Sequence, residues 1–115
     1  TRADSISVAS PANGRMAVNY INDSGAWATQ VSDEEISAAQ LELASEAGTF
    51  VEPAAAAAYA GFNADLAAGR INKDQKIVVL LTGIGFKDMS AVTNTVSVPK
   101  AVKPNMQAVE EFLNR

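Results

Sequence analysis

The sequence predicts an α/β fold in which helices pack against a mostly parallel sheet, as one domain over residues 1–115. Three observations support this. The run at residues 77–81 is apolar throughout, which is typical of a strand buried on both faces. Short β-prone segments at residues 5–8 and 27–31 alternate with helical patterns. Finally, 115 residues with 48% hydrophobic content suffice for one core but are too few for two.

The amino-terminal half begins with the strand over residues 5–8. Pro11 then opens a helix that stops before the Asp-Ser-Gly at residues 23–25. The second strand covers residues 27–31, and its Trp27 is expected in the core rather than on a ligand. Ser32 and Glu35 predict a capping box for the next helix, which ends at Gly48. Its predicted core face consists of Ile36, Ala39, Leu43 and Ala47.

The carboxyl-terminal half starts with an alanine-rich helix. Pro53 suits its first position because the missing N–H would be unpaired there in any case. Gly69 stops this helix at about Ala68. The remaining predicted elements are a polar turn at 72–74, the strand 77–81, a short helix at 89–94, an extended segment at 98–104 and a helix at 105–113.

Composition excludes several classes of function. The chain has no Cys, which removes disulfides and thiolate metal sites, and no His, the commonest general base and metal ligand. We therefore predict no metal site and no serine-histidine hydrolase. A net charge of -4 without a basic cluster argues against nucleic acid. No apolar run reaches the roughly 20 residues of a membrane span. A cytoplasmic protein is expected.

The loop at residues 82–88 directly follows the strand 77–81 and is the first candidate site. Ligands bind beyond the carboxyl ends of parallel strands. Thr82 supplies a hydroxyl there, while Gly83 and Gly85 let a ligand approach the backbone. The loop fits neither a Walker motif nor the GxGxxG fingerprint, where Asp88 would repel a pyrophosphate. An ordinary strand-to-helix turn remains the alternative interpretation.

A second candidate segment covers residues 48–54, where Glu52 precedes the alanine-rich helix. An acidic residue suits the positive end of the helix dipole. A helix of alanines has little side-chain bulk and can lie close to a sheet or to a flat ligand. The alternative is a good helix former that only fills space.

Together these motifs resemble the carboxyl-terminal part of threonine synthase, a pyridoxal-phosphate enzyme of fold type II (the tryptophan synthase β-like group). The resemblance covers nearly the whole chain. Residues 3–8 look like that family's "ADSISV" segment, and residues 31–36 resemble "V-[ST]-D-E-E-I". Residues 48–54 match "G-x-F-x-E-P-A", and residues 81–88 match "L-T-G-x-G-L-K-D" except for Phe86. The implied fold is a fragment of a three-layer α/β/α domain with a mostly parallel sheet.

The resemblance also implies cofactor-binding residues. The Thr82 hydroxyl would hydrogen-bond the pyridine nitrogen of pyridoxal 5'-phosphate, and as a neutral partner it would leave that nitrogen largely unprotonated. Gly83 and Gly85 would shape the turn beside the ring. Glu52 and Ala54 would line the wall next to the cofactor. Lys87 and Asp88, in the same loop, would support it.

The lysine that binds the cofactor covalently in this family has no counterpart here, so we predict no catalytic residue in this chain and no activity for it alone. The implied partners are the missing amino-terminal part or a second subunit, an amino-acid substrate, and in the complete enzyme a homo-oligomer. The complete enzyme would convert O-phospho-L-homoserine and water into L-threonine and phosphate. The alternatives are a noncatalytic partner-binding module, or part of another fold type II lyase such as threonine dehydratase or cysteate synthase.

Overall fold

The computed structural model describes residues 1–93, 96–97 and 99–114. Its elements, with η marking a 3₁₀ helix, are η1 (Asp4–Ile6), α1 (Gly14–Ser24), α2 (Asp33–Glu46), α3 (Pro53–Ala67), η2 (Gly85–Lys87), α4 (Ser90–Thr93) and α5 (Met106–Leu113). Asn94, predicted at the end of a helix, and Val98, predicted to be extended, lie outside the described residues.

The predicted sheet is not present in the described part of the chain. In place of the strand at residues 5–8 there is the 3₁₀ helix η1, and residues 27–31 and 77–81 carry no regular structure. The β-pairing that is present is one isolated antiparallel bridge between Val51 and Ile84. A strand needs a neighbour to satisfy its backbone N–H and C=O groups, and the described residues offer these segments no such neighbour.

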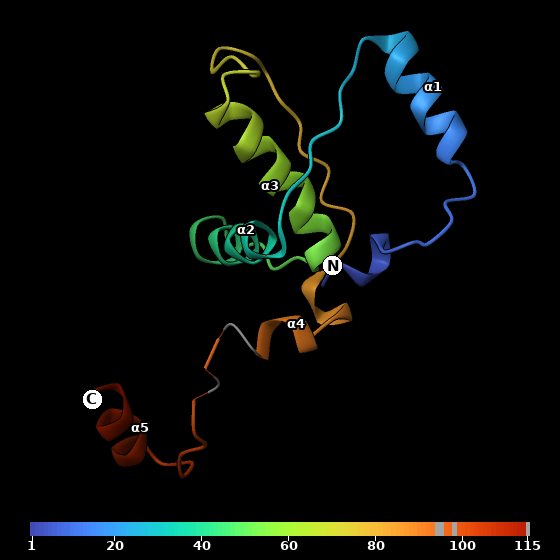
Figure 1. Ribbon diagram of the computed structural model, residues 1–115. Coiled ribbons are helices and arrows are strands. Elements are labelled where there is room, and N and C mark those ends of the chain that lie inside the picture. Colours follow the sequence, from blue (N-terminus) through green and yellow to red (C-terminus); the bar gives the residue numbers. More distant parts are fainter. Residues whose placement is uncertain (94–95, 98, 115) are drawn as a thin grey trace.

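The centre of the molecule is the crossing of α2 and α3, with η1 against α3 (Figure 1). The side chains of Ile36, Ala39 and Leu43 are buried on one face of α2, as predicted. Ala47 is exposed instead, because α2 ends at Glu46 and the chain turns away. Among the described residues, the buried apolar core consists of Ala3, Ile36, Ala39, Leu43, Val51, Ala55, Ala56 and Ala60.

The predicted capping box of α2 is confirmed. The Glu35 N–H donates to the Ser32 hydroxyl at 3.2 Å, and the Ser32 N–H donates to Glu35 Oε2 at 2.6 Å. These bonds, the backbone one first, hold the pKa of Glu35 below its ordinary value. At the other end Gly48 adopts a φ of 62°, which lets the Thr49 N–H donate to the Leu43 carbonyl at 2.9 Å.

Helix α3 begins with Pro53 at its first position and ends one residue before the predicted boundary, followed by Gly69 at a φ of 70°. Helices α1 and α5 also lie close to their predicted ranges, but neither contains a buried residue. Figure 1 shows both helices apart from the α2–α3 pair. Their amphipathic sequences therefore have an apolar face without a partner in the described part of the chain.

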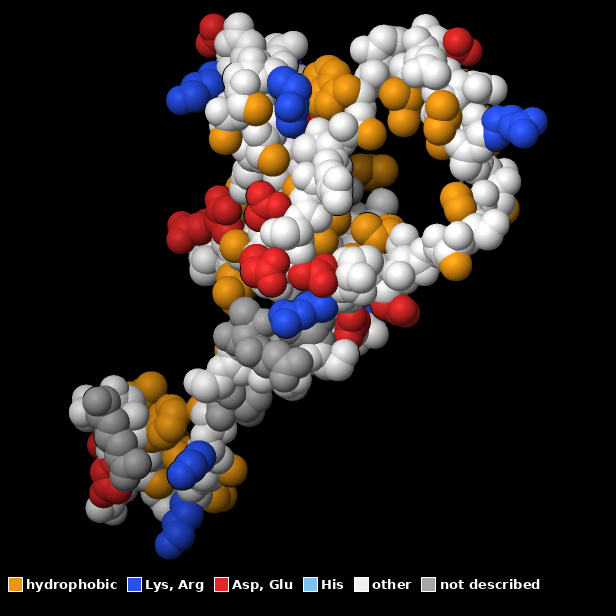
Figure 2. All heavy atoms as spheres, in the orientation of Figure 1, with side chains coloured by type: hydrophobic (Ala, Val, Ile, Leu, Met, Phe, Trp, Pro, Cys, Tyr) orange, Lys and Arg blue, Asp and Glu red, His pale blue; other side chains and the backbone are white. Residues whose placement is uncertain are grey.

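The molecule is far more open than a compact domain of its size. Its radius of gyration is 18.4 Å, against about 13 Å for a compact chain of this length. Its accessible surface is 8836 Å², against about 6,000 Å² for a compact monomer of 12.0 kDa. Figure 2 shows apolar side chains exposed over α1 and beside α3. The fold thus presents roughly 2,800 Å² of surface beyond what a compact monomer has.

Candidate functional site

The two motif segments singled out in the sequence lie against each other. Val51 and Ile84 form the antiparallel bridge, and the Glu52 N–H donates to the Gly83 carbonyl at 3.1 Å. The bridge thereby joins the start of α3 to the loop that follows residues 77–81. Sequence positions more than thirty apart meet at one place, as a shared ligand site requires.

Glu52 is buried at this junction, with 6% of the residue exposed. It is the residue before α3, but its side chain does not cap that helix. Its Oε2 atom accepts a hydrogen bond from the Ser5 hydroxyl at 3.3 Å. Its Oε1 atom lies so close to Gly83 that a Cβ atom there would stand only 2.0 Å away. The carboxylate therefore packs between η1 and the loop.

Gly85 shows the same kind of close packing on the other side of the bridge. Its N–H donates to the Phe50 carbonyl at 3.0 Å, and a Cβ atom on Gly85 would stand 2.5 Å from the Phe50 ring. The ring in turn meets Phe86 edge to face, with centroids 5.3 Å apart. Neither Gly85 nor Gly83 has a positive φ. Glycine is needed here for space rather than for a left-handed backbone.

Thr82 lies at the exposed edge of this junction. Within the described residues its hydroxyl makes no hydrogen bond, so it is free to donate to a ligand. Ala54 is half-buried in the first turn of α3 and packs against the core. A neutral donor at an open edge, followed by the two glycines at 83 and 85, suits the nitrogen side of a flat aromatic ring.

A cavity of about 330 Å³ adjoins the junction. It lies between η1, the start of α3, η2 and α4, and it is lined by Asp4, Ser5, Glu52, Lys87, Asp88 and Ser90. Lys87 and Asp88 thus lie beside the bridge, and their role in supporting the loop stays a prediction. Because three of the six lining residues are acidic, this cavity does not fit a phosphate group.

A polar cluster around Asp65 was missed by the sequence analysis. Asp65 is 7% exposed and accepts from Trp27 Nε1 at 2.7 Å, from the Thr29 hydroxyl at 2.8 Å and from Arg70 Nε at 2.9 Å. These donors, the Trp27 indole first, hold the pKa of Asp65 below its ordinary value. The cluster fastens the segment at residues 27–31 to α3.

The expectation that Trp27 lies in the core is wrong, because this residue is 53% exposed and belongs to the Asp65 cluster. The indole nitrogen points to Asp65, so only part of the ring can be covered. One signal was available in the sequence. An aspartate within an otherwise alanine-rich, apolar helix needs polar partners, but the sequence does not say that they lie 36 and 38 positions away.

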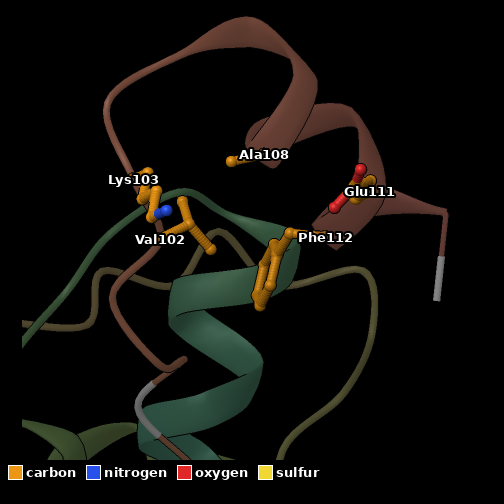
Figure 3. A pocket seen from close by; sticks show the side chains of 5 residues that line it. All are labelled: Val102, Lys103, Ala108, Glu111 and Phe112. Carbon is orange, nitrogen blue, oxygen red and sulfur yellow. The ribbon is translucent and has the colours of Figure 1, made fainter.

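The cavities away from the bridge include one along α3 and one beside α5. One of about 330 Å³ runs along α3 and the apolar residues 77–80. The other, about 150 Å³, is shown in Figure 3 and lies between α5 and the segment before it. No motif residue lines the cavity beside α5. Among the described residues there is no cluster of three metal-ligating side chains, and no helix has the length and apolarity needed to cross a membrane.

Comparisons with known proteins agree with the motifs. A family model described as "Pyridoxal-phosphate dependent enzyme" matches residues 1–83. The chain is 38% identical over 113 residues to threonine synthase of Methanocaldococcus jannaschii, covering 98% of this chain and 28% of that protein. It is 40% identical over 105 residues to threonine synthase of Halalkalibacterium halodurans, covering 91% and 30%. It is 39% identical over 113 residues to threonine synthase of Methanosarcina acetivorans, covering 98% of this chain and 28% of that protein. The chain therefore spans less than a third of these relatives.

Proposed function

Because the chain belongs to the pyridoxal-phosphate dependent enzyme family, we propose that it is the part of a threonine synthase-like enzyme that faces the pyridine nitrogen of the cofactor. The complete enzyme would convert O-phospho-L-homoserine and water into L-threonine and phosphate. The bridge between Val51 and Ile84 carries the proposal. It brings both family motifs together and leaves the Thr82 hydroxyl free beside them.

In this assignment Thr82 donates a hydrogen bond to the pyridine nitrogen and so orients the ring. When bound, pyridoxal phosphate supplies an electron sink for negative charge on the substrate carbon. A hydroxyl does not carry the charge needed to keep the nitrogen protonated, so this sink is moderate. Gly83 and Gly85 hold the loop flat against Glu52 and Phe50, which keeps Thr82 in place.

Within this chain, Glu52 and Ala54 would form the wall beside the ring. The remaining contacts to the cofactor would come from polypeptide that this chain does not supply. The covalent lysine and the phosphate-binding loop would belong to the amino-terminal part of the enzyme or to a second subunit. The surface exposed beyond that of a compact monomer, roughly 2,800 Å², supports this, because it is more than three times the about 800 Å² that one partner buries in a standard interface.

We further propose that the complete enzyme is a cytoplasmic homo-oligomer and has the three-layer α/β/α fold with a mostly parallel sheet. Residues 27–31 and 77–81 would become strands of that sheet once neighbours from the rest of the domain pair with them. Val78 is 90% exposed and Leu80 is 73% exposed, which is unusual for residues of a β-prone apolar run. Burial on both faces of a parallel sheet would remove this exposure.

A second candidate is a noncatalytic module that uses the same exposed apolar segments to bind a partner chain. Part of another fold type II lyase, such as threonine dehydratase or cysteate synthase, is a third. The exposed segments support the second candidate as well as the first, and the motif "LTGxGxKD" favours threonine synthase over the third. Binding of the cofactor separates the first candidate from the second, and turnover of O-phospho-L-homoserine separates it from the third.

The test is a titration with pyridoxal phosphate, followed by absorbance between roughly 300 and 500 nm. The chain is measured alone and with the remaining portion of a relative, such as the Methanocaldococcus jannaschii enzyme, as a separate polypeptide. We expect the chain alone to show no absorbance band of bound cofactor. The mixture should show a stronger band than the remaining portion shows by itself. Thr82→Ala should weaken cofactor affinity about threefold to tenfold, as one lost hydrogen bond does.

Two variants serve as controls. Thr82→Ser keeps the hydroxyl and should bind as the unaltered chain does. Thr49→Ala removes an exposed hydroxyl that bonds only to the Ala47 carbonyl, and it should also leave the affinity unchanged. If mixing adds no bound cofactor, the chain is a noncatalytic module and the proposed function is wrong.

A further inference from the structure

We propose that Ser5 is a positioning residue, which acts through Glu52 to hold the loop at Thr82 and Gly83 in place. The inference rests on the proposed function for its link to the cofactor, but its structural part can be tested without cofactor. Ser5 is outside the two motif segments that form the bridge. Its hydroxyl nevertheless reaches across 47 sequence positions to the carboxylate at their junction.

The local structure around Ser5 accounts for this reach. Ala3 is fully buried and fixes the start of η1 in the core, beside α3. The Ile6 N–H donates to the Ala3 carbonyl at 3.1 Å, and the Ser7 N–H donates to the Asp4 carbonyl at 2.9 Å. These bonds make one 3₁₀ turn, which directs the Ser5 side chain toward the start of α3. In this position the Ser5 hydroxyl donates a hydrogen bond to Glu52 Oε2 at 3.3 Å.

Glu52 passes this constraint on to the loop. One carboxylate oxygen accepts from Ser5, while the other lies over the Cα of Gly83, where even a methyl group has no room. The Glu52 backbone holds the same residue, because its N–H donates to the Gly83 carbonyl at 3.1 Å. Without its hydroxyl partner, the Glu52 carboxylate would gain rotameric freedom and would no longer pack closely against Gly83. Thr82 is covalently joined to Gly83, so its hydroxyl would lose its fixed position.

The first experiment measures amide hydrogen exchange in the full 115-residue chain without cofactor. We expect Ser5→Ala to speed exchange of the N–H groups of Glu52 and Gly85 about fivefold, corresponding to the loss of one hydrogen bond. Ser5→Thr keeps a hydroxyl and should restore slow exchange. Ser7→Ala is the matched control, since Ser7 is exposed and its hydroxyl makes no hydrogen bond within the described residues. Exchange in α2 should be the same in all variants, which shows that the fold is retained.

The inference is overturned if Ser5→Ala exchanges as Ser7→Ala does at both amides. A second experiment measures cofactor affinity and the position of the absorbance band in the mixture with the remaining portion of a relative. Ser5→Ala should weaken affinity about twofold to fivefold, a smaller effect than that of Thr82→Ala, and Ser7→Ala should have none.

The two experiments separate the failure of the inference from that of the proposed function. Fast exchange in Ser5→Ala together with unchanged cofactor affinity would limit Ser5 to a structural role and overturn its positioning role. If the unaltered chain adds no bound cofactor in the mixture, the proposed function fails. The exchange data then still decide whether Ser5 holds the loop.

Discussion

The close contact between Gly83 and Glu52 makes Gly83→Ala the most informative stability variant. The added Cβ would stand 2.0 Å from Glu52 Oε1, 2.3 Å from its Cδ and 2.8 Å from its Cγ, whereas ordinary contact begins at 3.4 Å. The overlap of about 1.4 Å with the nearest atom is too large for a small adjustment. The Glu52 side chain must leave its place and give up its bond to Ser5. Overpacking of this kind costs about 1–3 kcal/mol.

Gly61→Ala provides the matched comparison. Gly61 lies inside α3, and a Cβ there would meet no atom within 4 Å. The same chemical change should therefore stabilise the chain by about 0.5–1 kcal/mol, because alanine loses less backbone entropy than glycine in a helix. The two variants are expected to shift stability in opposite directions.

Thermal unfolding followed by circular dichroism at 222 nm measures both effects. For a chain of this size, Gly83→Ala should lower the Tm by at least about 4 °C, and Gly61→Ala should raise it by a few degrees. A Tm for Gly83→Ala equal to or above that of the unaltered chain would refute the packing argument. It would mean that Glu52 swings aside without cost, and that the loop is not held by the carboxylate.

Two further predictions concern polar groups in the helical part of the chain. Ser32→Ala removes the capping box of α2 and should destabilise the chain by about 0.5–2 kcal/mol in urea unfolding, whereas Ser45→Ala, whose hydroxyl bonds only to carbonyls of its own helix, should not. The pKa of Asp65 is lowered in the folded chain, so the unfolded chain binds the proton more tightly. The stability that the Asp65 carboxylate contributes is therefore present above its ordinary pKa of 3.8 and is lost as pH falls through the lower folded pKa. The fluorescence emission of Trp27, the single tryptophan, should report this loss of stability below pH 3.8. Asp65→Asn should remove the part of the pH dependence of stability that Asp65 contributes. An acid transition that is unchanged in Asp65→Asn would contradict the assignment of this transition to Asp65.

The helices were predictable from the sequence because their signals are local. The Ser32 and Glu35 pair, Pro53 at a first helical position and the glycines at 48 and 69 fix the ends of α2 and α3. Each of these signals acts over a few residues, and none needs the rest of the molecule.

The strands were predicted from residue types, but a strand exists only as part of a pair. The segment at residues 77–81 has the composition of a buried strand, and within the described residues it lacks a neighbour to supply hydrogen bonds. Local propensity therefore gave the wrong structure for the isolated chain. The sheet stays a prediction for the complete enzyme.

The sequence motifs named candidate site residues but not the contacts that these residues make. They predicted Thr82, Gly83, Gly85 and Glu52 as cofactor-binding residues, which stays a prediction, and gave ligand approach as the reason for the two glycines. The structure adds a second reason, since both glycines make room for side chains of this chain. Ser5 and Asp65 depend on partners far away in the sequence, and no local pattern shows such contacts.

The bridge between Val51 and Ile84 has a consequence for the order of folding. It joins residues 33 positions apart and encloses all of α3, while the α2–α3 pair forms from neighbouring segments. Closing such a loop costs entropy before the two short backbone hydrogen bonds of the bridge are gained. The helical pair should therefore form first and the bridge last. By the same reasoning, the ligand edge at Thr82 is completed only after the helical pair has formed, so during refolding the capacity to bind should return later than the helix signal.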